Sequence, residues 1–564
     1  MDFQRLLLIG VIGVLSFMLL TEWVNFRQEQ TTATRQPNIQ NIENPTQPAT
    51  SRNHSIPDTS IEEGLDLPVI TEYAVKLETS NTNVSDIITV RTDVLIVTLD
   101  TSGGDISSVS LLDYATQLNT PDDPFQLLER SSTREYYAQS GLIGKNGIDS
   151  SGNRPQFRSS KNNYRLLEDQ NNLVVDLLYF DDAGINVTKR FTFYRGEYIL
   201  DVEYIIENDS TQDWRGNLFA QIKRDNSADP AADSSGMGMV PYLGAAITQP
   251  DKRFNKISFD DMRDEPLKTT VTGGWIAMIQ HYFLSAWIPN PNLQHNYSST
   301  VTKNDSNIIR FTSPETLVEP GTKSTIKTQF YAGPKDQYRL EEISEGLDLS
   351  VDYGWLWWIA QPLFWLLTKI QSVFSNWGVA IILLTVLIKA SFYRLSAASY
   401  RSMANMRRVQ PKMAEIKERY GDDRQKQSQA MMELYKKEKI NPLGGCLPIL
   451  VQMPVFISLY WVLMESVELR HSPFILWIQD LSVMDPYFVL PLIMGVSMFV
   501  QQKLNPPPPD PMQAKVMQWM PVIFTFFFLF FPAGLVLYWV VNNLLSILQQ
   551  WFITRQVENI ASNQ

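Results

Sequence analysis

The chain of 564 residues is long enough for two or three domains, and its 48 Lys+Arg against 60 Asp+Glu give a formal net charge of −12. Residues 25–350 hold 29 Lys+Arg and 45 Asp+Glu, a net charge of −16, whereas the rest holds 19 and 15, a net charge of +4. An acidic part beside a basic, apolar part indicates two compartments rather than a nucleic-acid-binding protein. Cys446 is the only cysteine and the four histidines lack ligand spacing, so we expect no disulfide within the chain, no metal site and no cofactor.

Residues 1–27 are predicted to form an N-terminal transmembrane anchor. The apolar run Leu6–Leu20 reaches membrane length if it continues through Val24, and Trp23 suits the aromatic belt of an interface. A cleaved signal peptide would begin in the same way, but no A-x-A-like cleavage site follows. We therefore expect an uncleaved anchor with a cytoplasmic N-terminus. A flexible linker, rich in Gln, Thr, Asn, Pro and Ser, is predicted over residues 28–60.

Residues 61–350 are predicted to form a large β-sandwich domain outside the membrane. Short segments of β type alternate there with Gly, Asp and Asn, and Arg195-Gly196 is placed to form a hairpin turn. Many short strands with such punctuation are typical of a sandwich. The expected strands include Val94–Leu99, Leu173–Tyr179, Val187–Tyr194, Tyr198–Ile206 and Thr325–Tyr331.

The predicted sandwich carries no convincing catalytic motif. It contains neither a Gly-rich phosphate loop nor a nucleophile elbow, and its acidic pairs are too common to define a glycosidase site. We interpret His281, between Trp275 and Trp287, as a packed histidine within a strand. A periplasmic carbohydrate-active enzyme stays an alternative, which paired carboxylates in a cleft at glycosidase separation would favour.

Residues 351–376 are predicted to form an amphipathic helix lying in the membrane interface. Apolar side chains cover most of one helical face, interrupted by Gln361, Pro362, Lys369 and Gln371. A true membrane span is the alternative, but the polar interruptions disfavour it.

Lys389 is the most informative residue, because the sequence places it inside an apolar span. The uncharged run Trp377–Ile388 is too short to cross a hydrocarbon core of roughly 30 Å, which needs about 20 helical residues. The first core span is therefore predicted over residues 377–400, with Lys389 about 18 Å along the helix. A charge there costs about 2.5–3.5 kcal/mol, so it pairs, snorkels or lines a wet cavity. Position alone does not separate a snorkelling lysine from a functional one.

Residues 396–440 are predicted to form a cytoplasmic helical hairpin. Residues 389–440 carry 13 Lys+Arg against 6 Asp+Glu, which the positive-inside rule places in the cytoplasm. Two helical arms flank a turn at Gly421-Asp422-Asp423, with Pro411 as a kink. The charges are explained by ordinary solvation, but methionines at helical spacing leave a docking role open.

Further apolar stretches complete the helical region. Asn441-Pro442 is a good helix start, and the second core span is expected over 441–464. The third span is expected over 484–502, after an acidic external loop. The last stretch, residues 516–550, exceeds one span and is interrupted by Pro532-Ala533-Gly534, so the residues alone allow one tilted helix or two spans.

Several motifs resemble the YidC membrane protein insertase family. They are Asn441-Pro-Leu-Gly-Gly-Cys-Leu-Pro, Gln452-Met-Pro-Val-Phe, the turn Gly421-Asp-Asp, and Phe531-Pro-Ala-Gly-Leu-Val-Leu-Tyr538. The resemblance covers the whole chain in the same order and implies a mixed fold, in which a polytopic α-helical core of five helices joins an N-terminal anchor and a periplasmic β-sandwich. It favours two last spans, over 512–531 and 535–552, and a cytoplasmic tail over 553–564.

The resemblance also implies a site. Family members have a positively charged residue, most often Arg, at the position of Lys389, facing a hydrophilic substrate groove. Thr385 lies one turn earlier on the same face. Gln452, Tyr538 and Trp539 match other groove or substrate-contact positions, although helix packing is the favoured explanation for Tyr538. Lys keeps the charge but lacks the planar fork of Arg that binds a carboxylate through two bonds.

The implied function is insertion, folding and assembly of inner-membrane proteins, alone or with a Sec-type translocon. No covalent bond changes, so we expect no enzyme, no catalytic residue and no cofactor. The implied partners are nascent membrane proteins, the lipid bilayer, a Sec-type translocon and the ribosome, although the short tail lacks the basic extension through which many members would reach ribosomes. A transporter that uses Lys389 as a binding charge is the runner-up, but the chain shows no matching halves. The likeness of the sandwich to sugar-binding folds is analogy alone.

Overall fold

A computed structural model describes residues 87–149, 154–232, 241–421, 423–438, 447–505 and 511–562. The predicted anchor (1–27), the predicted linker (28–60), the start of the second core span and residues 506–510 lie outside the described residues.

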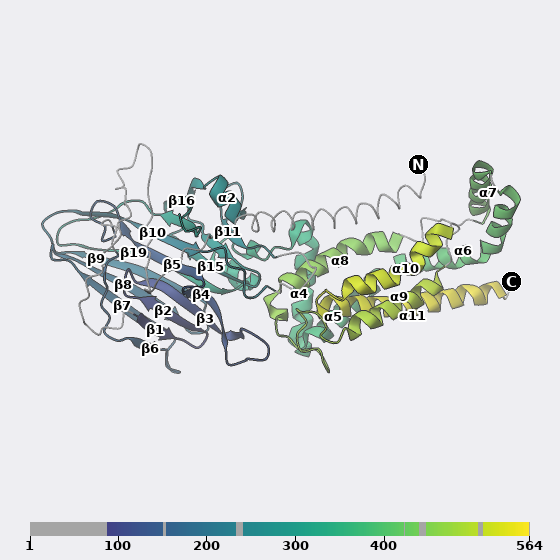
Figure 1. The fold of residues 1–564 in the computed structure, drawn as a ribbon, viewed down its shortest axis with the longest axis horizontal. Helices are drawn as coiled ribbons and strands as arrows, with labels where there is room; N and C mark the ends of the chain where they lie inside the picture. Colours follow the sequence, from purple (N-terminus) through teal and green to yellow (C-terminus); the bar gives the residue numbers. More distant parts are fainter. Residues whose placement is uncertain are drawn as a thin grey trace, which may run out of the picture. The chain divides into compact units, whose positions relative to one another are not determined.

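The strands of the described residues form two large sheets, one of 11 strands and one of eight (Figure 1). All the pairings between neighbouring strands are antiparallel except that of β1 with β6. The larger sheet has the order β13 (Lys268–Thr272), β16 (Gln294–Val301), β17 (Asn307–Thr312), β10 (Trp214–Arg224), β5 (Glu135–Ile143), β4 (Pro124–Arg130), β3 (Asp105–Ala115), β2 (Leu95–Asp100), β1 (Ile87–Arg91), β6 (Asn163–Arg165), with β18 (Thr316–Val318) also on β10. The smaller sheet has the order β12 (Asn255–Ile257), β11 (Gly244–Ile247), β14 (Ile276–Ile279), β15 (Phe283–Ile288), β19 (Lys323–Pro334), β9 (Ile199–Asn208), β8 (Ile185–Tyr194), β7 (Asn172–Phe180).

Strand β8 shows why these segments are strands. Its side chains alternate between buried and half-buried along all ten residues, as the period of two in a strand requires. At its end Gly196 takes the left-handed conformation, with φ of +71°, and the chain returns as β9 in register with β8. The predicted hairpin at Arg195-Gly196 is therefore confirmed. Each of the five predicted segments coincides with a strand, although Val94 and Tyr198 lie one residue before β2 and β9.

The two sheets enclose one hydrophobic core, which makes this domain a sandwich. Buried side chains of both sheets form a continuous cluster. Polar side chains cross it in pairs: the Tyr136 hydroxyl lies 2.8 Å from Ser285 Oγ, and Ser140 Oγ lies 2.9 Å from the Tyr204 hydroxyl. The predicted combination of a β-sandwich domain with a helical region is confirmed.

A buried ion cluster lies inside the sandwich. The Arg154 guanidinium donates to Asp149 Oδ1 at 2.6 Å and also pairs with Asp105, and all three side chains are at most 1% exposed. Lys189 Nζ donates to the carbonyls of Gly103 and Ser140 at 3.0 and 3.1 Å. A side chain on Gly103 would collide with the Arg154 guanidinium, so this position requires glycine. The carboxylates of this cluster are occupied by cations and do not line a cleft.

Helix α2 (Phe259–Asp264) lies between β12 and β13, and the other helices of the described residues follow β19 in the chain. The other short helices are α3 (Gln337–Ile343), η1 (Asp348–Ser350), η2 (Gly354–Leu356) and η4 (Val467–Leu469). The longer ones are α4 (Trp357–Phe374), α5 (Trp377–Ser391), α6 (Tyr393–Tyr420), α7 (Arg424–Lys437), α8 (Leu447–Glu465), α9 (Val489–Leu504), α10 (Pro511–Phe528) and α11 (Ala533–Ser562) (Figure 1). Helix α11 packs against α5, α6, α8 and α9, and α4 packs against α5 and α8.

The apolar helices differ in length. Residues Ala533–Val557 of α11 are long and apolar enough to cross a bilayer, whereas the apolar parts of α8, α9 and α10 are shorter. Helix α9 has 16 residues, which correspond to about 24 Å at 1.5 Å per residue. The arms of the hairpin, α6 and α7, pack through Met406, Val409, Met413, Met431, Leu434 and Tyr435, so this methionine seam holds the two arms together.

The first core span differs from the continuous helix expected over 377–400. Helix α5 ends at Ser391, and α6 continues from Tyr393 at an angle of 68°. The Ser391 hydroxyl donates to the Leu387 carbonyl four residues earlier at 3.0 Å, a bond that is known to bend helices. Lys389 consequently lies in the last turn of α5 rather than in the middle of a helix.

His281 also differs from its predicted place within a strand. It lies in the turn between β14 and β15, where its ring stacks on Tyr282 and its Nε2 lies 2.9 Å from the Met464 carbonyl at the end of α8. Nearby, Lys335 donates to Glu465 at 2.7 Å, and both side chains are at most 5% exposed. Val467 of η4 packs into the sandwich core. These contacts join the sandwich to the segment that follows α8.

The buried ion cluster makes a prediction about stability. Replacing Arg154 by Met leaves two buried carboxylates without their cation and should cost about 3–5 kcal/mol. Arg190→Met is the matched control, since its pair with Asp176 is more than one-third exposed and should cost under about 1 kcal/mol. Thermal unfolding of the full chain in detergent measures both. Equal losses would mean that the buried cluster contributes no more than a surface pair.

Glu468 makes a prediction about pH. Burial, with the Asp336 carboxylate nearby, raises the pKa of Glu468 from 4.5 to about 7. The folded protein therefore binds this proton more tightly than the unfolded one, and stability falls as the pH rises from 4.5 through 7. Glu468→Gln should stabilise the protein at pH 8 by up to about 3 kcal/mol and have little effect at pH 4.5. The exposed Glu341→Gln should shift the thermal midpoint at neither pH, and a gain from Glu468→Gln that is the same at both would contradict the assignment.

Candidate functional site

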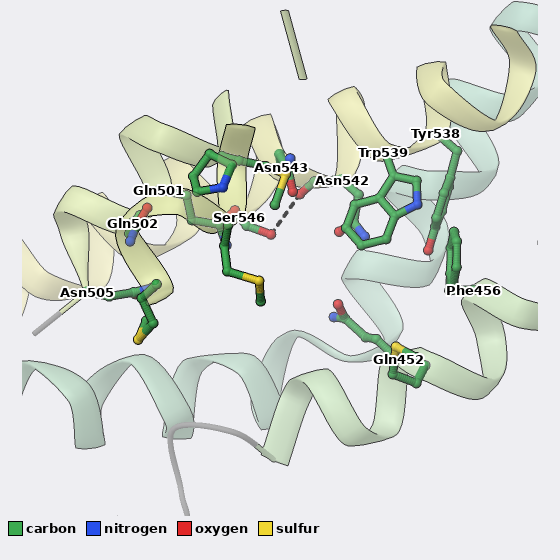
Figure 2. Close-up of a pocket in the computed structure, with 15 residues that line it drawn as sticks. Gln452, Phe456, Gln501, Gln502, Asn505, Tyr538, Trp539, Asn542, Asn543 and Ser546 are labelled. Carbon is green, nitrogen blue, oxygen red and sulfur yellow. Dashed lines mark hydrogen bonds between the residues drawn. The ribbon is translucent and has the colours of Figure 1, made fainter. Parts of the chain in front are cut away.

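A cavity of about 270 Å³ lies among α8, α9, α10 and α11 (Figure 2). We call it the amide-lined cavity, because six side-chain amides line it together with aromatic rings, methionines and the hydroxyls of Tyr538 and Ser546. Its lining consists of Gln452, Met453, Phe456, Met498, Gln501, Gln502, Asn505, Met517, Met520, Pro521, Tyr538, Trp539, Asn542, Asn543 and Ser546. Every polar side chain of this lining is uncharged at neutral pH.

Helix α11 supplies one wall of the amide-lined cavity. Trp539, Asn542, Asn543 and Ser546 recur at spacings of three and four residues, which place them on one face of a helix. Figure 2 shows the amide of Gln452 reaching from α8 toward the Trp539 and Asn542 side chains. Gln501 and Gln502, at the end of α9, line another part of the wall.

Lys389 lies behind this wall rather than in it. Its Nζ donates to Ser546 Oγ at 2.7 Å, and Ser546 Oγ in turn donates to the Asn542 carbonyl at 2.7 Å. Lys389 is 9% exposed, and the partner that the structure gives its ammonium is the uncharged Ser546. The cation therefore reaches the amide-lined cavity through the Ser546 hydroxyl.

Thr385 is buried one turn before Lys389. Its hydroxyl donates to the Ile381 carbonyl at 2.7 Å, within its own helix, and Thr385 is not part of the cavity lining. The structure thus brings Gln452, Tyr538 and Trp539 together in the lining and leaves Lys389 and Thr385 adjacent to each other on α5.

Aromatic packing holds the α8 and α11 walls together. The Tyr538 ring stacks on Phe456 with centroids 6.2 Å apart, and Tyr538 is only 2% exposed. The Trp539 ring meets Phe456 edge-on at 4.9 Å and Phe528 at 5.4 Å. Tyr538 therefore packs between helices and also contributes to the lining.

Sequence reasoning missed Asn542, Asn543, Ser546, Gln501, Gln502 and Asn505. The sequence contains a pattern that could have identified those on α11, because amides and a hydroxyl recur at helical spacing within an apolar stretch from Trp539 to Gln550. Polar residues inside a membrane segment mark functional positions by default. The motif that carries the family resemblance ends at Tyr538, before this longer pattern.

Comparisons with known proteins identify the family. Residues 87–366 match the model of the YidC periplasmic domain, and residues 369–560 match that of the 60Kd inner membrane protein family. The protein named "Membrane protein insertase YidC" of Marinomonas sp. (strain MWYL1) is 53% identical over 568 residues, which cover 100% of both chains. This chain belongs to the YidC membrane protein insertase family.

Other members are similar over the same length. The protein of the same name from Stutzerimonas stutzeri (strain A1501) is 53% identical and covers 99% of both chains. Among solved structures, a crystal structure of an active YidC insertase with its first transmembrane domain matches at 18% identity and a TM-score of 0.37, covering 83% of this chain and 92% of that one.

The bond between Lys389 and Ser546 makes a testable prediction. Ser546→Ala removes the partner of a buried ammonium and should destabilise the protein by about 1–2 kcal/mol. In a Lys389→Met background the same substitution should cost much less, because no ammonium is left unpaired. A double-mutant cycle of thermal unfolding in lipid nanodiscs gives the coupling energy. Strictly additive losses would show that the two side chains do not interact.

Proposed function

We propose that this protein inserts membrane proteins into the bacterial inner membrane and acts there as a membrane chaperone, alone or with a Sec-type translocon. The observation that carries the proposal is a polar cavity inside helices whose other faces are apolar. Six amides line the cavity, whereas Val496, Val522, Ile523 and Leu548 of the same helices are exposed. In a membrane protein such exposed apolar side chains face lipid, and polar groups gather where they serve a substrate or a pathway.

The amide-lined cavity would act on the polar tail that a substrate must carry across the membrane. Burying a polar group without a hydrogen-bonding partner costs several kcal/mol in hydrocarbon. Amides and hydroxyls in the cavity offset part of that cost for the tail. A tail held partway into the membrane has a shorter apolar distance left to cross.

Helix lengths support the same mechanism. Helix α9, with 16 residues, spans about 24 Å, less than the roughly 30 Å of a typical hydrocarbon core. A bilayer that adapts to short helices becomes locally thinner, at a modest free-energy cost for each ångström of mismatch. A locally thinner bilayer and a polar cavity would both lower the free-energy barrier to moving the polar tail of the substrate across the membrane.

Lys389 would supply the electrostatic part of the mechanism. Its ammonium stands one hydroxyl away from the cavity, so an acidic tail would be attracted toward the Ser546 end of the lining. The membrane potential, worth about 2.3 kcal/mol per charge per 100 mV, then helps acidic residues outward. The apolar segment of the substrate leaves sideways into lipid. We assign Lys389, Thr385, Gln452, Tyr538 and Trp539 to this site, with Thr385 as the neighbour one turn before Lys389.

The partners follow from this mechanism. Nascent membrane proteins are the substrates, and the basic hairpin α6–α7 would receive them on the cytoplasmic side, from the ribosome or a Sec-type translocon. The tail over 553–564 would lie on that side too. The sandwich, matched by the periplasmic family model, would lie on the other. The chain needs no cofactor for this work, because no covalent bond is made or broken.

Insertion by purified protein in proteoliposomes tests the proposal. A single-span substrate with an acidic external tail should insert at least tenfold more slowly with Lys389→Ala, since charges about 8 Å apart at an effective dielectric constant near 20 interact by about 2 kcal/mol. Lys389→Arg keeps the charge and should retain most of the rate. The same substrate with a neutral tail should be far less sensitive to Lys389→Ala.

Two outcomes would count against this account. If the unmodified protein inserts neither substrate above the rate of empty liposomes, insertion is not its activity. If Lys389→Ala slows both tails equally, the lysine serves the folding of the helical region rather than the substrate.

A further inference from the structure

Three polar atoms in the wall of the amide-lined cavity have no hydrogen-bonding partner among the described residues. They are the indole Nε1 of Trp539, Oδ1 of Asn542 and Oε1 of Gln502, and each atom is buried. Other amides of the same wall are occupied: Asn543 Nδ2 donates to Ser497 Oγ at 3.2 Å. Buried polar atoms are nearly always paired, so three unpaired ones in one cavity wall call for an explanation.

Each of these three atoms can take only one role in a hydrogen bond, either donor or acceptor. The indole N–H of Trp539 is a donor only, whereas Oδ1 of Asn542 and Oε1 of Gln502 are acceptors. Trp539 and Asn542 are three residues apart on α11, so their side chains are neighbours on one face, about one helical turn apart. Figure 2 shows both side chains directed to the same side of α11, opposite Gln452. A donor and an acceptor at such a spacing complement a group that carries one acceptor and one donor.

A peptide group carries this combination, one C=O and one N–H. We propose that Trp539 and Asn542, with Gln502 beside them, bind uncharged peptide groups of the substrate's polar tail, so that the amide-lined cavity recognises backbone rather than side-chain charge. Trp539 donates to a substrate carbonyl, and Asn542 accepts from a substrate N–H. This inference rests on the proposed function and names the chemical class that the cavity binds.

The rest of the lining fits a backbone ligand better than a charged one. The lining contains no charged side chain, and the nearby cation, Lys389, is already bonded to Ser546. Met453, Met498, Met517 and Met520 surround the amides with flexible apolar side chains, which adapt to different neighbours. A site that binds the backbone and has adaptable apolar surroundings tolerates many substrate sequences. An insertase that acts on many substrates requires such tolerance.

The inference also states which conformation binds. In an α-helix each interior N–H and C=O is already bonded within the helix. Only a tail that is extended or unwound offers free peptide groups, and such groups are the costly ones in a membrane. The cavity would therefore hold the tail unwound and release the apolar segment, whose helix satisfies its own backbone.

Matched variants and matched tails test the inference. Asn542→Leu removes the acceptor and keeps the number of side-chain heavy atoms, whereas Trp539→Phe removes the donor together with one ring. The controls are Gln549→Leu and Trp551→Phe, which make similar changes on α11 at positions outside the cavity lining. Each variant is assayed for insertion of one single-span substrate with either a neutral Gly-Ser tail or an acidic tail of equal length.

We expect Asn542→Leu and Trp539→Phe each to slow insertion about three- to tenfold, the loss of one hydrogen bond, and to slow both tails equally. The controls should stay within about twofold of the unmodified protein, and Asn542→Gln, which keeps a side-chain carbonyl, should retain more activity than Asn542→Leu. Thermal unfolding in nanodiscs shows that the variants remain folded.

A synthetic tail with ester bonds in place of alternate peptide bonds gives a readout of the backbone itself. Each ester removes an N–H donor but keeps the side chains. We expect the unmodified protein to insert the ester tail more slowly than the amide tail, after correction for spontaneous insertion into empty liposomes. With Asn542→Leu this difference should largely disappear, because the acceptor is gone.

The outcomes separate this inference from the proposed function. If the unmodified protein inserts neither tail, the proposed function is wrong. Suppose that the unmodified protein inserts both tails and that Asn542→Leu slows only the acidic one. The cavity then recognises side-chain charge, so the inference of backbone binding is overturned while the proposed function stands. Equal rates for ester and amide tails in the unmodified protein would overturn it in the same way.

Discussion

The helical region depends on how one buried ammonium is accommodated. Lys389 stands in the last turn of α5, where a charge costs several kcal/mol unless it is bonded, and Ser546 of α11 supplies the bond. That bond ties α5 to α11 behind the cavity wall and turns the Ser546 hydroxyl toward the Asn542 carbonyl. Lys389 is thereby held outside the lining of the amide-lined cavity, which contains no charged side chain.

The sandwich and the helical region each contain a buried polar cluster, and the two clusters differ in how their groups are bonded. Inside the sandwich, both buried carboxylates pair with Arg154, and Lys189 bonds to two carbonyls, so the cluster contributes to a single packed structure. In the helical region, Trp539, Asn542 and Gln502 keep donors and acceptors unpaired at a cavity wall. Unpaired groups lower stability, and proteins retain them where a ligand completes the bonding. Arg154 Nε is unpaired as well, but it is packed among its ion partners, whereas the three residues of the helical region line a cavity, which supports a binding role for them.

Local patterns in the sequence were sufficient for much of the fold. Alternation predicted strands such as β8, and the Arg195-Gly196 turn was placed correctly because glycine marks a left-handed position. The bend after Ser391 was missed, since the apolar pattern of the sequence does not mark it. Lys389 was identified by its cost in an apolar span, but its partner was not. Ser546 lies 157 residues away, and no pattern within α5 points to it. The amides of α11 were predictable in principle from their spacing, whereas their pairing depends on which helices pack together.

The separation of charge from amides explains how one site can serve different substrates. A cation in the cavity would favour acidic tails and hinder basic ones, since like charges repel strongly in a low dielectric. Neutral donors and acceptors that bind the backbone, as we propose, would set a common affinity, because every tail shares the backbone. Lys389, one hydroxyl removed, adds a bias that depends on charge without excluding neutral tails. Substitution of the amides should therefore change the rate for all substrates, and substitution of the lysine should change the preference among them.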